Sequence, residues 1–310
     1  MFAAYCLYTV RMLGPTRNSF PIRKLVSFTW PLSIGNLVGF AYGWFDRAIL
    51  IAFVPLASLG IYNAVLYAFG ALVILSASFG NVLLPFYSRL SSGSREDCRK
   101  ATWAASRYVS LVIVPLAFGL FATAKPALTL FVGEAYVGGV VPLMVLSLPF
   151  ALTAFSLAMS PMLTAFAKTR AVMWITVSSL ALALVSAYIL LPFMGIIAAS
   201  VARGVATFVS LGLTIFVLRR IGVMSVDAEM TWKTLVAGAG MAGALVATQM
   251  VIYSALLLPF YVLLGAVVYL FLLRFLKAVR KHDIELIEKY LGSRLAFVAK
   301  SLSVILLGRH

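Results

Sequence analysis

The sequence has few charged residues and few cysteines. Only 11% of its 310 residues are charged, whereas 63% are hydrophobic and the mean hydropathy is +1.05. A water-soluble domain of this size could not cover that much apolar surface with so few charges. This composition excludes a soluble globular protein. The two cysteines, Cys6 and Cys98, are too few to form a disulfide framework.

Short motifs of catalysis and metal binding are absent too. The chain contains no HExxH, no CxxC and no glycine-rich phosphate loop. Its two histidines, His282 and His310, lie outside the apolar segments, and no Ser–His or paired-Asp arrangement is visible. We therefore expect that the protein is not an enzyme and that it has no metal site and no cofactor.

The chain does contain a series of apolar runs of about 20 residues, the length that crosses the hydrocarbon core of a bilayer. Because backbone polar groups in lipid must be satisfied internally, long continuous runs indicate helices. We expect an all-α, multi-span membrane bundle of about eight transmembrane helices with a C-terminal amphipathic helix. The expected spans are residues 25–53, 59–88, 103–124, 138–166, 171–193, 195–218, 233–256 and 259–279.

Four regions are expected along the chain. They are a cytoplasmic or interfacial segment (1–24), a six-helix lobe (25–219), two additional helices (220–281) and a cytoplasmic amphipathic tail (282–310). The N-terminal apolar run is too short to span and has no basic residue before it, so it is not a signal peptide. It is either the end of a preceding helix or an interfacial segment. The tail helix lies on the membrane surface or packs under the bundle.

The net charge of +16 would suggest nucleic acid for a soluble protein, but here its distribution indicates topology. In the expected arrangement, 22 of the 25 lysines and arginines fall on one side, including five in the 89–107 loop that ends at Arg107. Only Lys125 falls on the other side. The positive-inside rule then places both termini in the cytoplasm. We expect a multi-pass plasma-membrane protein in contact with the lipid bilayer and no nucleic acid partner.

Three charged residues remain inside the expected spans: Asp46, Arg47 and Arg203. A charge at mid-membrane costs about 2.5–3.5 kcal/mol on insertion scales, so each is a candidate functional residue. Asp46 and Arg203 lie at similar depths, roughly 10–12 Å from the outer ends of their helices. We expect them to pair across helices or to face one polar cavity. The structural alternative is that Arg47 extends to the outer interface and the charges only fix helix depth.

Small and polar residues accompany these charges. Gly35, Gly39 and Gly43 are spaced by four residues, as are Gly195, Ala199 and Arg203, and AGAGMAGA covers residues 237–244; such rows allow close helix packing. The polar residues Asn36, Asn63, Tyr67 and Asn81 are further candidates for a cavity lining. For the last three, hydrogen bonds between helices are the favoured explanation.

Several segments resemble one transporter family. RKLVSFTWPLSIGNLVGFAYGWFDRAIL, LGIYNAVLYAFG and LLPFYSRLS follow one another and contain the pattern W-x-D-R-x-x-L … G-x-Y-N. LTLFVGEAYVGGVVPLMVLSLPF and LPFMGIIAASVARG follow in the same order. Together they resemble the polysaccharide-export flippases of the multidrug/oligosaccharidyl-lipid/polysaccharide (MOP) superfamily. The resemblance covers roughly residues 20–300 and corresponds to helices seven to fourteen of such a flippase, so the N-terminal lobe is absent.

This resemblance implies translocation of a lipid-linked oligosaccharide, or another polysaccharide precursor, by alternating access between two lobes. Arg47 and Arg203 would bind the phosphate or pyrophosphate headgroup, because arginine binds phosphate through bidentate charge-assisted bonds. Asp46 would hold an arginine when no substrate is present, or take up a coupling proton or cation. A missing N-terminal lobe or a homodimer would supply the second cavity wall.

Two other functions stay open at this point. A MATE-like drug or cation antiporter would have similar helices, although the GxYN and GExY segments favour the polysaccharide branch. A truncated, non-transporting membrane subunit is the other possibility, because one lobe alone provides only half of a transport cavity.

Overall fold

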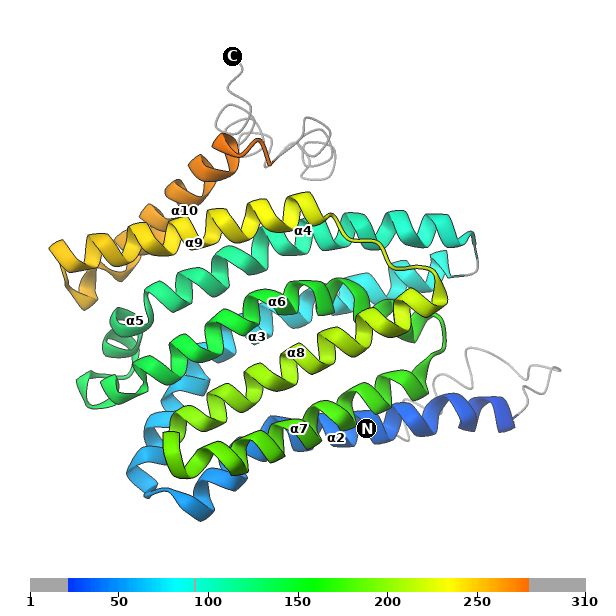
Figure 1. Cartoon of the computed structure of the whole chain (residues 1–310), viewed down its shortest axis with the longest axis horizontal. Coiled ribbons are helices and arrows are strands. Elements are labelled where there is room, and N and C mark those ends of the chain that lie inside the picture. Colours follow the sequence, from blue (N-terminus) through cyan, green and yellow to red (C-terminus); the bar gives the residue numbers. More distant parts are fainter. Residues whose placement is uncertain (1–21, 92, 279–310) are drawn as a thin grey trace, which may run out of the picture.

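The computed structural model describes residues 22–91 and 93–278, and its described elements are helices (Figure 1). The long helices are α2 (Ile22–Phe53), α3 (Leu56–Leu90), α4 (Arg95–Ala122), α6 (Val140–Ala165), α7 (Thr169–Met194), α8 (Ile196–Ile221), α9 (Ala228–Val251) and α10 (Leu258–Phe275). Shorter pieces are α5 (Ala124–Phe131) and the 3₁₀ helices Glu134–Gly139 and Ala255–Leu257. The predicted all-α bundle is confirmed. The predicted tail helix and most of the N-terminal segment lie outside the described residues.

Seven of the described helical segments are long and apolar enough to cross a membrane. Helix α2 is not among them, although its 32 residues exceed the required length. The polar residue Asn36 and the charged residues Asp46 and Arg47 lower the mean hydropathy of α2. The predicted span over 25–53 is thus a helix, and its place within the membrane stays a prediction.

The third expected span starts at residue 103, inside a longer helix. Helix α4 begins eight residues earlier, at Arg95. Ser94 caps it, since its hydroxyl accepts a hydrogen bond from the Asp97 N–H at 3.1 Å, and Glu96 and Asp97 lie in the first turn. Four of the five basic residues assigned to the 89–107 loop, including Arg107, therefore lie in α4, and the fifth, Arg89, lies in the last turn of α3.

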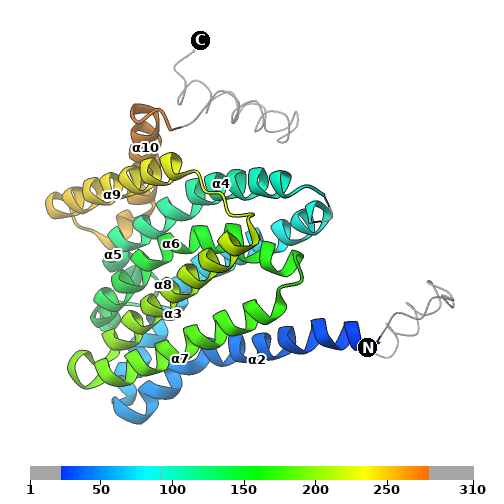
Figure 2. The same ribbon diagram turned by 45° about the vertical axis from the view of Figure 1, so that its right-hand side comes forward.

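The helices form a row with one helix behind it. In Figure 1, α10, α9, α4, α6, α8 and α7 follow one another, and each packs on the next. Helix α2 packs along α7 at one end of the row, and α3 packs on α6 (Figure 1). Figure 2 shows the N-terminal part of α2 extending away from the other helices. In this arrangement, one cavity is lined by residues of α2, α3, α6, α7 and α8.

Apolar clusters hold the row together. The largest contains residues of α3, α4, α5, α6, α7 and α8, and includes Leu128 of α5 with Leu143 and Met159 of α6, all fully buried. The second joins α4 to α9 and α10 through residues such as Met241 and Tyr261. Many large apolar side chains remain exposed on the outer faces of the helices, as expected where lipid, not water, is the solvent.

Glycines on α9 differ in how closely they approach a neighbouring helix. A Cβ atom at Gly238 would lie 2.8 Å from Phe118 Cδ2 and 3.0 Å from Val114 Cγ1, both on α4. A Cβ at Gly243 would meet nothing within 4 Å. A Cβ at Gly240 would lie 2.8 Å from Leu272 Cδ1 of α10, so the row of small residues in 237–244 allows close packing on both α4 and α10, which supports the packing interpretation of this row.

Substitution of Gly238 by leucine should destabilise the protein by about 1–3 kcal/mol, because the added side chain must displace Phe118 and Val114. Gly243→Leu is the matched control in the same helix and should be neutral or slightly stabilising. Unfolding of the purified chain in mixed micelles measures both. Equal destabilisation by the two variants would contradict a specific close contact between Gly238 and α4.

Candidate functional site

Asp46 is the centre of a buried polar junction between three helices. Its carboxylate, on α2, is fully buried and accepts a hydrogen bond from Arg203 Nε of α8 at 2.6 Å. The Tyr62 hydroxyl of α3 donates to the same oxygen at 2.8 Å, and the Arg47 backbone N–H donates to the other at 2.9 Å. The predicted pairing of Asp46 with Arg203 is confirmed. Helix α2 packs mainly on α7. The hydrogen bonds of Asp46 additionally connect α2 to α3 and α8.

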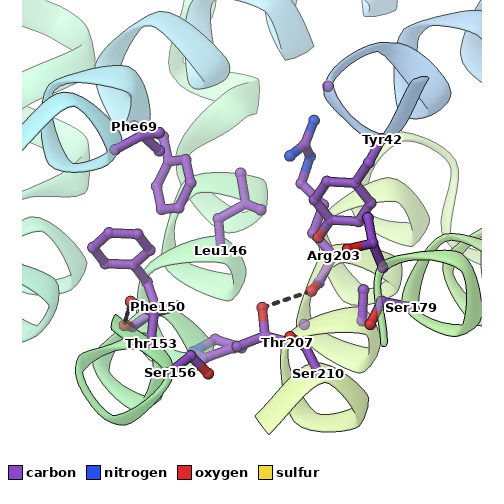
Figure 3. A pocket seen from close by; sticks show the side chains of 16 residues that line it. Tyr42, Phe69, Leu146, Phe150, Thr153, Ser156, Ser179, Arg203, Thr207 and Ser210 are labelled. Atoms are coloured by element: carbon purple, nitrogen blue, oxygen red, sulfur yellow. Dashed lines mark hydrogen bonds between the residues drawn. The ribbon is translucent and has the colours of Figure 1, made fainter. Parts of the chain in front are cut away.

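The Arg203 side chain lies between the Asp46 junction and a cavity. Its guanidinium carbon is 5.4 Å from the ring centroids of Tyr42 and Phe45, and 17% of the side chain is exposed. Only Nε donates a hydrogen bond within the described residues. Figure 3 shows the guanidinium end between Tyr42 on one side and Phe69 and Leu146 on the other. The terminal amino groups are therefore available for a ligand while Nε holds Asp46.

The cavity beside Arg203 has a volume of about 420 Å³ and is lined by α2, α3, α6, α7 and α8. Aromatic and apolar residues, among them Phe69 and Phe150, form one part of its wall (Figure 3). Hydroxyl groups form another part: Thr153, Ser156, Thr176, Ser179, Thr207 and Ser210. The cavity wall thus offers a ligand one cation, Arg203, together with several hydroxyl oxygens and aromatic rings. No other charged residue among those described lines this cavity.

Most of these hydroxyls donate to a carbonyl of their own helix, as Thr207 does to the Arg203 carbonyl oxygen at 3.0 Å (Figure 3). Their oxygens can still accept hydrogen bonds. Ser156 differs, because its hydroxyl is buried and has no hydrogen-bond partner within the described residues. A buried hydroxyl without a partner is costly, so Ser156 favours a polar occupant of the space beside it.

A second cavity of about 620 Å³ adjoins the first. The two cavities share Val73, Phe150, Thr153 and Ser156 as lining residues. Further polar residues of the second are Ser76, Asn81, Ser160 and Thr164. Four hydroxyl residues of α6, at positions 153, 156, 160 and 164, follow helical spacing and mark one face along both cavities. This hydroxyl stripe was not predicted, although the spacing of Ser and Thr in an otherwise apolar run was the available signal.

Arg47 does not line either cavity. Its Nε donates to Asn63 Oδ1 at 2.9 Å and its Nη1 to the Gly43 carbonyl at 3.2 Å. The guanidinium carbon also lies 4.7 Å from the centroid of the Trp44 ring. The helix–helix hydrogen bond predicted for Asn63 is thus confirmed. Of the two predicted phosphate-binding arginines, the structure places only Arg203 beside a cavity.

The remaining candidates are scattered. Asn81 lines the second cavity. Asn36 is exposed, and Tyr67 is 80% exposed. Neither Tyr67 nor Asn81 makes a hydrogen bond within the described residues, so the predicted helix–helix bonds of these two residues are wrong. Asn36 and Tyr67 are exposed because α2 and α3 bury other faces against the bundle.

One buried ion pair was missed entirely. Arg107 Nη1 of α4 lies 2.8 Å from Asp227 Oδ2, and both side chains are almost completely buried. Arg107 Nη2 also donates to the Ala278 carbonyl at 2.9 Å. Arg107 was expected in a loop, whereas the structure buries it within α4. This pair joins α4 to the α8–α9 linker and to the end of α10.

Comparison with known proteins gives two matches. Residues 1–142, somewhat less than half of the chain, match a family model described as polysaccharide biosynthesis protein. Among solved structures, the chain is similar to "Lipid II flippase MurJ, inward closed conformation", with a TM-score of 0.67 and 14% sequence identity. The match covers 83% of this chain and 55% of the MurJ chain. No curated protein sequence matches this chain.

These two findings agree with the segments identified in the sequence. The family match includes the whole W-x-D-R-x-x-L … G-x-Y-N region, which carries Asp46 and Tyr62. The structural match extends the shared fold over most of the described helices and, at this identity, concerns the fold alone. They confirm the predicted resemblance of the chain to the polysaccharide-export flippases of the multidrug/oligosaccharidyl-lipid/polysaccharide superfamily.

Proposed function

We propose that the chain is a membrane transporter, or the C-terminal half of one, that translocates lipid-linked oligosaccharides or other polysaccharide precursors by alternating access. The observation that carries this proposal is Arg203, which pairs with Asp46 through Nε while its terminal amino groups lie beside a hydroxyl-lined cavity. A lipid-linked sugar presents a phosphate or pyrophosphate next to a neutral, hydroxyl-rich saccharide. The cavity offers complementary groups for both parts.

Arg203 would exchange Asp46 for the substrate phosphate. The guanidinium fork binds two phosphate oxygens at once, and such charge-assisted bonds are roughly twice as strong as neutral ones. When Arg203 turns to the phosphate, Asp46 keeps the Tyr62 hydroxyl and the Arg47 backbone N–H. The carboxylate is therefore not left without partners, which lowers the cost of the exchange. Arg47 remains with Asn63 and takes no part in phosphate binding.

The saccharide would lie along the hydroxyl stripe of α6, defined by Thr153, Ser156, Ser160 and Thr164. Sugar hydroxyls are both donors and acceptors, so they can use the free acceptor capacity of these side chains. The unpartnered Ser156 hydroxyl gains a bond when the space is occupied. Phe69 and Phe150 add flat apolar faces to the same wall.

A complete passage needs a second wall. The chain spans 55% of the flippase structure that it matches, and its two cavities are not fully enclosed by the described residues. We propose that another helical bundle, either a separate N-terminal lobe or a second copy of this chain, completes their walls. The strong bias of basic residues supports an orientation with both termini in the cytoplasm.

The competing functions make different use of Asp46. A drug or cation antiporter needs a carboxylate free to bind a cation, whereas Asp46 is already paired with Arg203. A non-transporting subunit is favoured only by the partial coverage of the flippase structure. The paired aspartate thus favours an anionic substrate over a cationic one.

Reconstitution of the full 310-residue chain into vesicles tests the proposal. The probe is a fluorescent polyprenyl diphosphate oligosaccharide, with its appearance in the opposite leaflet followed by a membrane-impermeant quencher. We expect translocation that lipid-linked oligosaccharide without label inhibits and that an organic cation does not. Inhibition by the organic cation would favour an antiporter, and binding of the probe without translocation would favour a non-transporting subunit.

A further inference from the structure

A second cavity-lining group of arginines lies where α4 begins and α8 ends, away from the Asp46 junction. A cavity of about 440 Å³ is lined there by Arg99, Arg219, Gly222, Met224, Ser225 and Val226. We call this group the arginine cradle. No Asp or Glu is among its lining residues. The proposed transport of a lipid-linked sugar makes no use of it.

The cationic groups of the arginine cradle are available for an anion. Arg219 donates from Nε to Met224 Sδ at 3.3 Å, which orients its guanidinium and leaves both terminal amino groups free of hydrogen bonds within the described residues. Arg99 lies 3.7 Å from Glu96, and this pair is more than half exposed, so it holds Arg99 only weakly. The Ser225 hydroxyl adds a donor that has no partner in the described part of the chain.

The floor of the arginine cradle is fixed by buried hydrogen bonds to α4. Thr102 Oγ1 donates to the Val223 carbonyl at 3.0 Å, and the Asp227 N–H donates to Ser106 Oγ at 3.3 Å. The buried Arg107–Asp227 ion pair holds the far end of the same linker at 2.8 Å. Since α4 also carries Arg99, this arginine and the linker are held on one helix, and Arg219 lies at the end of α8 directly before the linker. Such preorganisation lowers the cost of binding a ligand.

Position along the helices places the arginine cradle at a membrane interface. Arg99 lies four residues before the apolar run of α4 begins at position 103, or roughly 6 Å outside it. Arg219 directly follows the apolar run of α8 that ends at position 218. Both arginines are on the side where basic residues gather, which the topology predicts to be cytoplasmic.

We propose that the arginine cradle binds the phosphate headgroup of an anionic membrane lipid. Its ligand must carry negative charge at the level of the lipid headgroups, and basic pockets at the cytoplasmic ends of transmembrane helices have this property. Two arginines and a hydroxyl provide bidentate and single hydrogen bonds to phosphate oxygens. A bound headgroup also links α4 to the α8–α9 linker.

The test uses the purified full-length chain in neutral detergent and counts bound phosphatidylglycerol by native mass spectrometry. Arg99→Gln/Arg219→Gln should weaken binding of the most tightly held lipid by about tenfold or more. Arg170→Gln/Arg220→Gln is the matched control, because it removes two charges from the same predicted side without touching the arginine cradle. We expect less than about a twofold change for the control.

Three further binding measurements complete the test. Arg99→Lys/Arg219→Lys keeps the charge and should lose less affinity than the glutamine variant, which excludes misfolding as the cause. Phosphatidylcholine should bind much more weakly than phosphatidylglycerol. Equal loss in the control variant would show a general charge effect and overturn the site. Displacement of the lipid by excess inorganic phosphate would assign the arginine cradle to a soluble anion instead of a lipid.

Discussion

Replacing Asp46 with alanine should lower the free energy of unfolding by about 3–5 kcal/mol, because it leaves the largely buried Arg203, 17% exposed, without its counter-charge. Arg203→Ala should cost a similar amount, since Asp46 is then a fully buried carboxylate without a counter-charge, although it keeps two hydrogen bonds. Unfolding of each variant in mixed micelles, at fixed lipid and detergent composition, measures the change. Asn36→Ala, an exposed position on the same helix, is the control and should change stability by less than about 0.5 kcal/mol.

The double variant Asp46→Ala/Arg203→Ala separates a true pair from two independent residues. Removing both charges eliminates the uncompensated group, so the double variant should be at least about 2 kcal/mol more stable than the sum of the single effects predicts. Additive effects of the two substitutions would contradict direct pairing. The remaining loss would reflect the Tyr62 hydrogen bond and the packing of both side chains.

Binding of a phosphate-bearing lipid should change in opposite directions when the pair is opened and when its cation is removed. Asp46→Asn keeps the shape of the side chain but releases Arg203 from its counter-charge, so affinity for a polyprenyl diphosphate disaccharide should rise about tenfold. Adding Arg203→Gln should then lower affinity by about 10- to 100-fold relative to Asp46→Asn, because charge-assisted hydrogen bonds contribute about 1.5–3 kcal/mol. Both variants are compared at equal fractions of folded protein, by equilibrium titration with the fluorescent lipid.

Arg47→Gln is the matched control for the binding experiment. Arg47 is next to Asp46 in sequence and is charged, but it bonds to Asn63 and lines neither cavity. We expect less than about a threefold change in affinity for this variant. A loss as large as that of the Arg203 variant would assign the phosphate to Arg47 and reverse the present choice between the two arginines.

The helices and the central ion pair could be predicted from the sequence because both have strong physical signals. Apolar runs of the required length identify helices in lipid, and charged residues in such runs are costly enough that they need partners. Asp46 and Arg203 have opposite charge at similar predicted depth, which made them the natural pair. Their partner Tyr62 was not singled out, because a tyrosine in a membrane helix is common and its hydroxyl bonds depend on the tertiary fold.

Arg107 was missed for a physical reason. Hydropathy identifies the apolar part of a helix but not a polar extension that is capped and continues beyond it, and α4 has such an extension from Arg95. A basic residue near the end of an apolar run then looks like part of a loop. Only the packed structure brings Asp227, 120 positions away along the chain, next to Arg107.

The hydroxyl stripe of α6 was not recognised because its members have nearly neutral hydropathy and are able to bond to their own helix, as Thr153 does to the Phe150 carbonyl. Such residues are compatible with a lipid-facing, helix-facing or cavity-facing position. Their cavity-facing position depends on how α3, α7 and α8 pack around α6. The two cavities therefore follow from the tertiary structure and not from the sequence pattern alone.

A structure of the full chain with a bound polyprenyl diphosphate oligosaccharide tests most directly whether Arg203 transfers from Asp46 to a substrate phosphate. We predict phosphate oxygens within about 3 Å of the Arg203 terminal amino groups, the saccharide along the α6 hydroxyl stripe, and Asp46 still bonded to Tyr62. A phosphate bound at Arg47, or a ligand outside both cavities with the Arg203–Asp46 pair unchanged, would contradict this exchange.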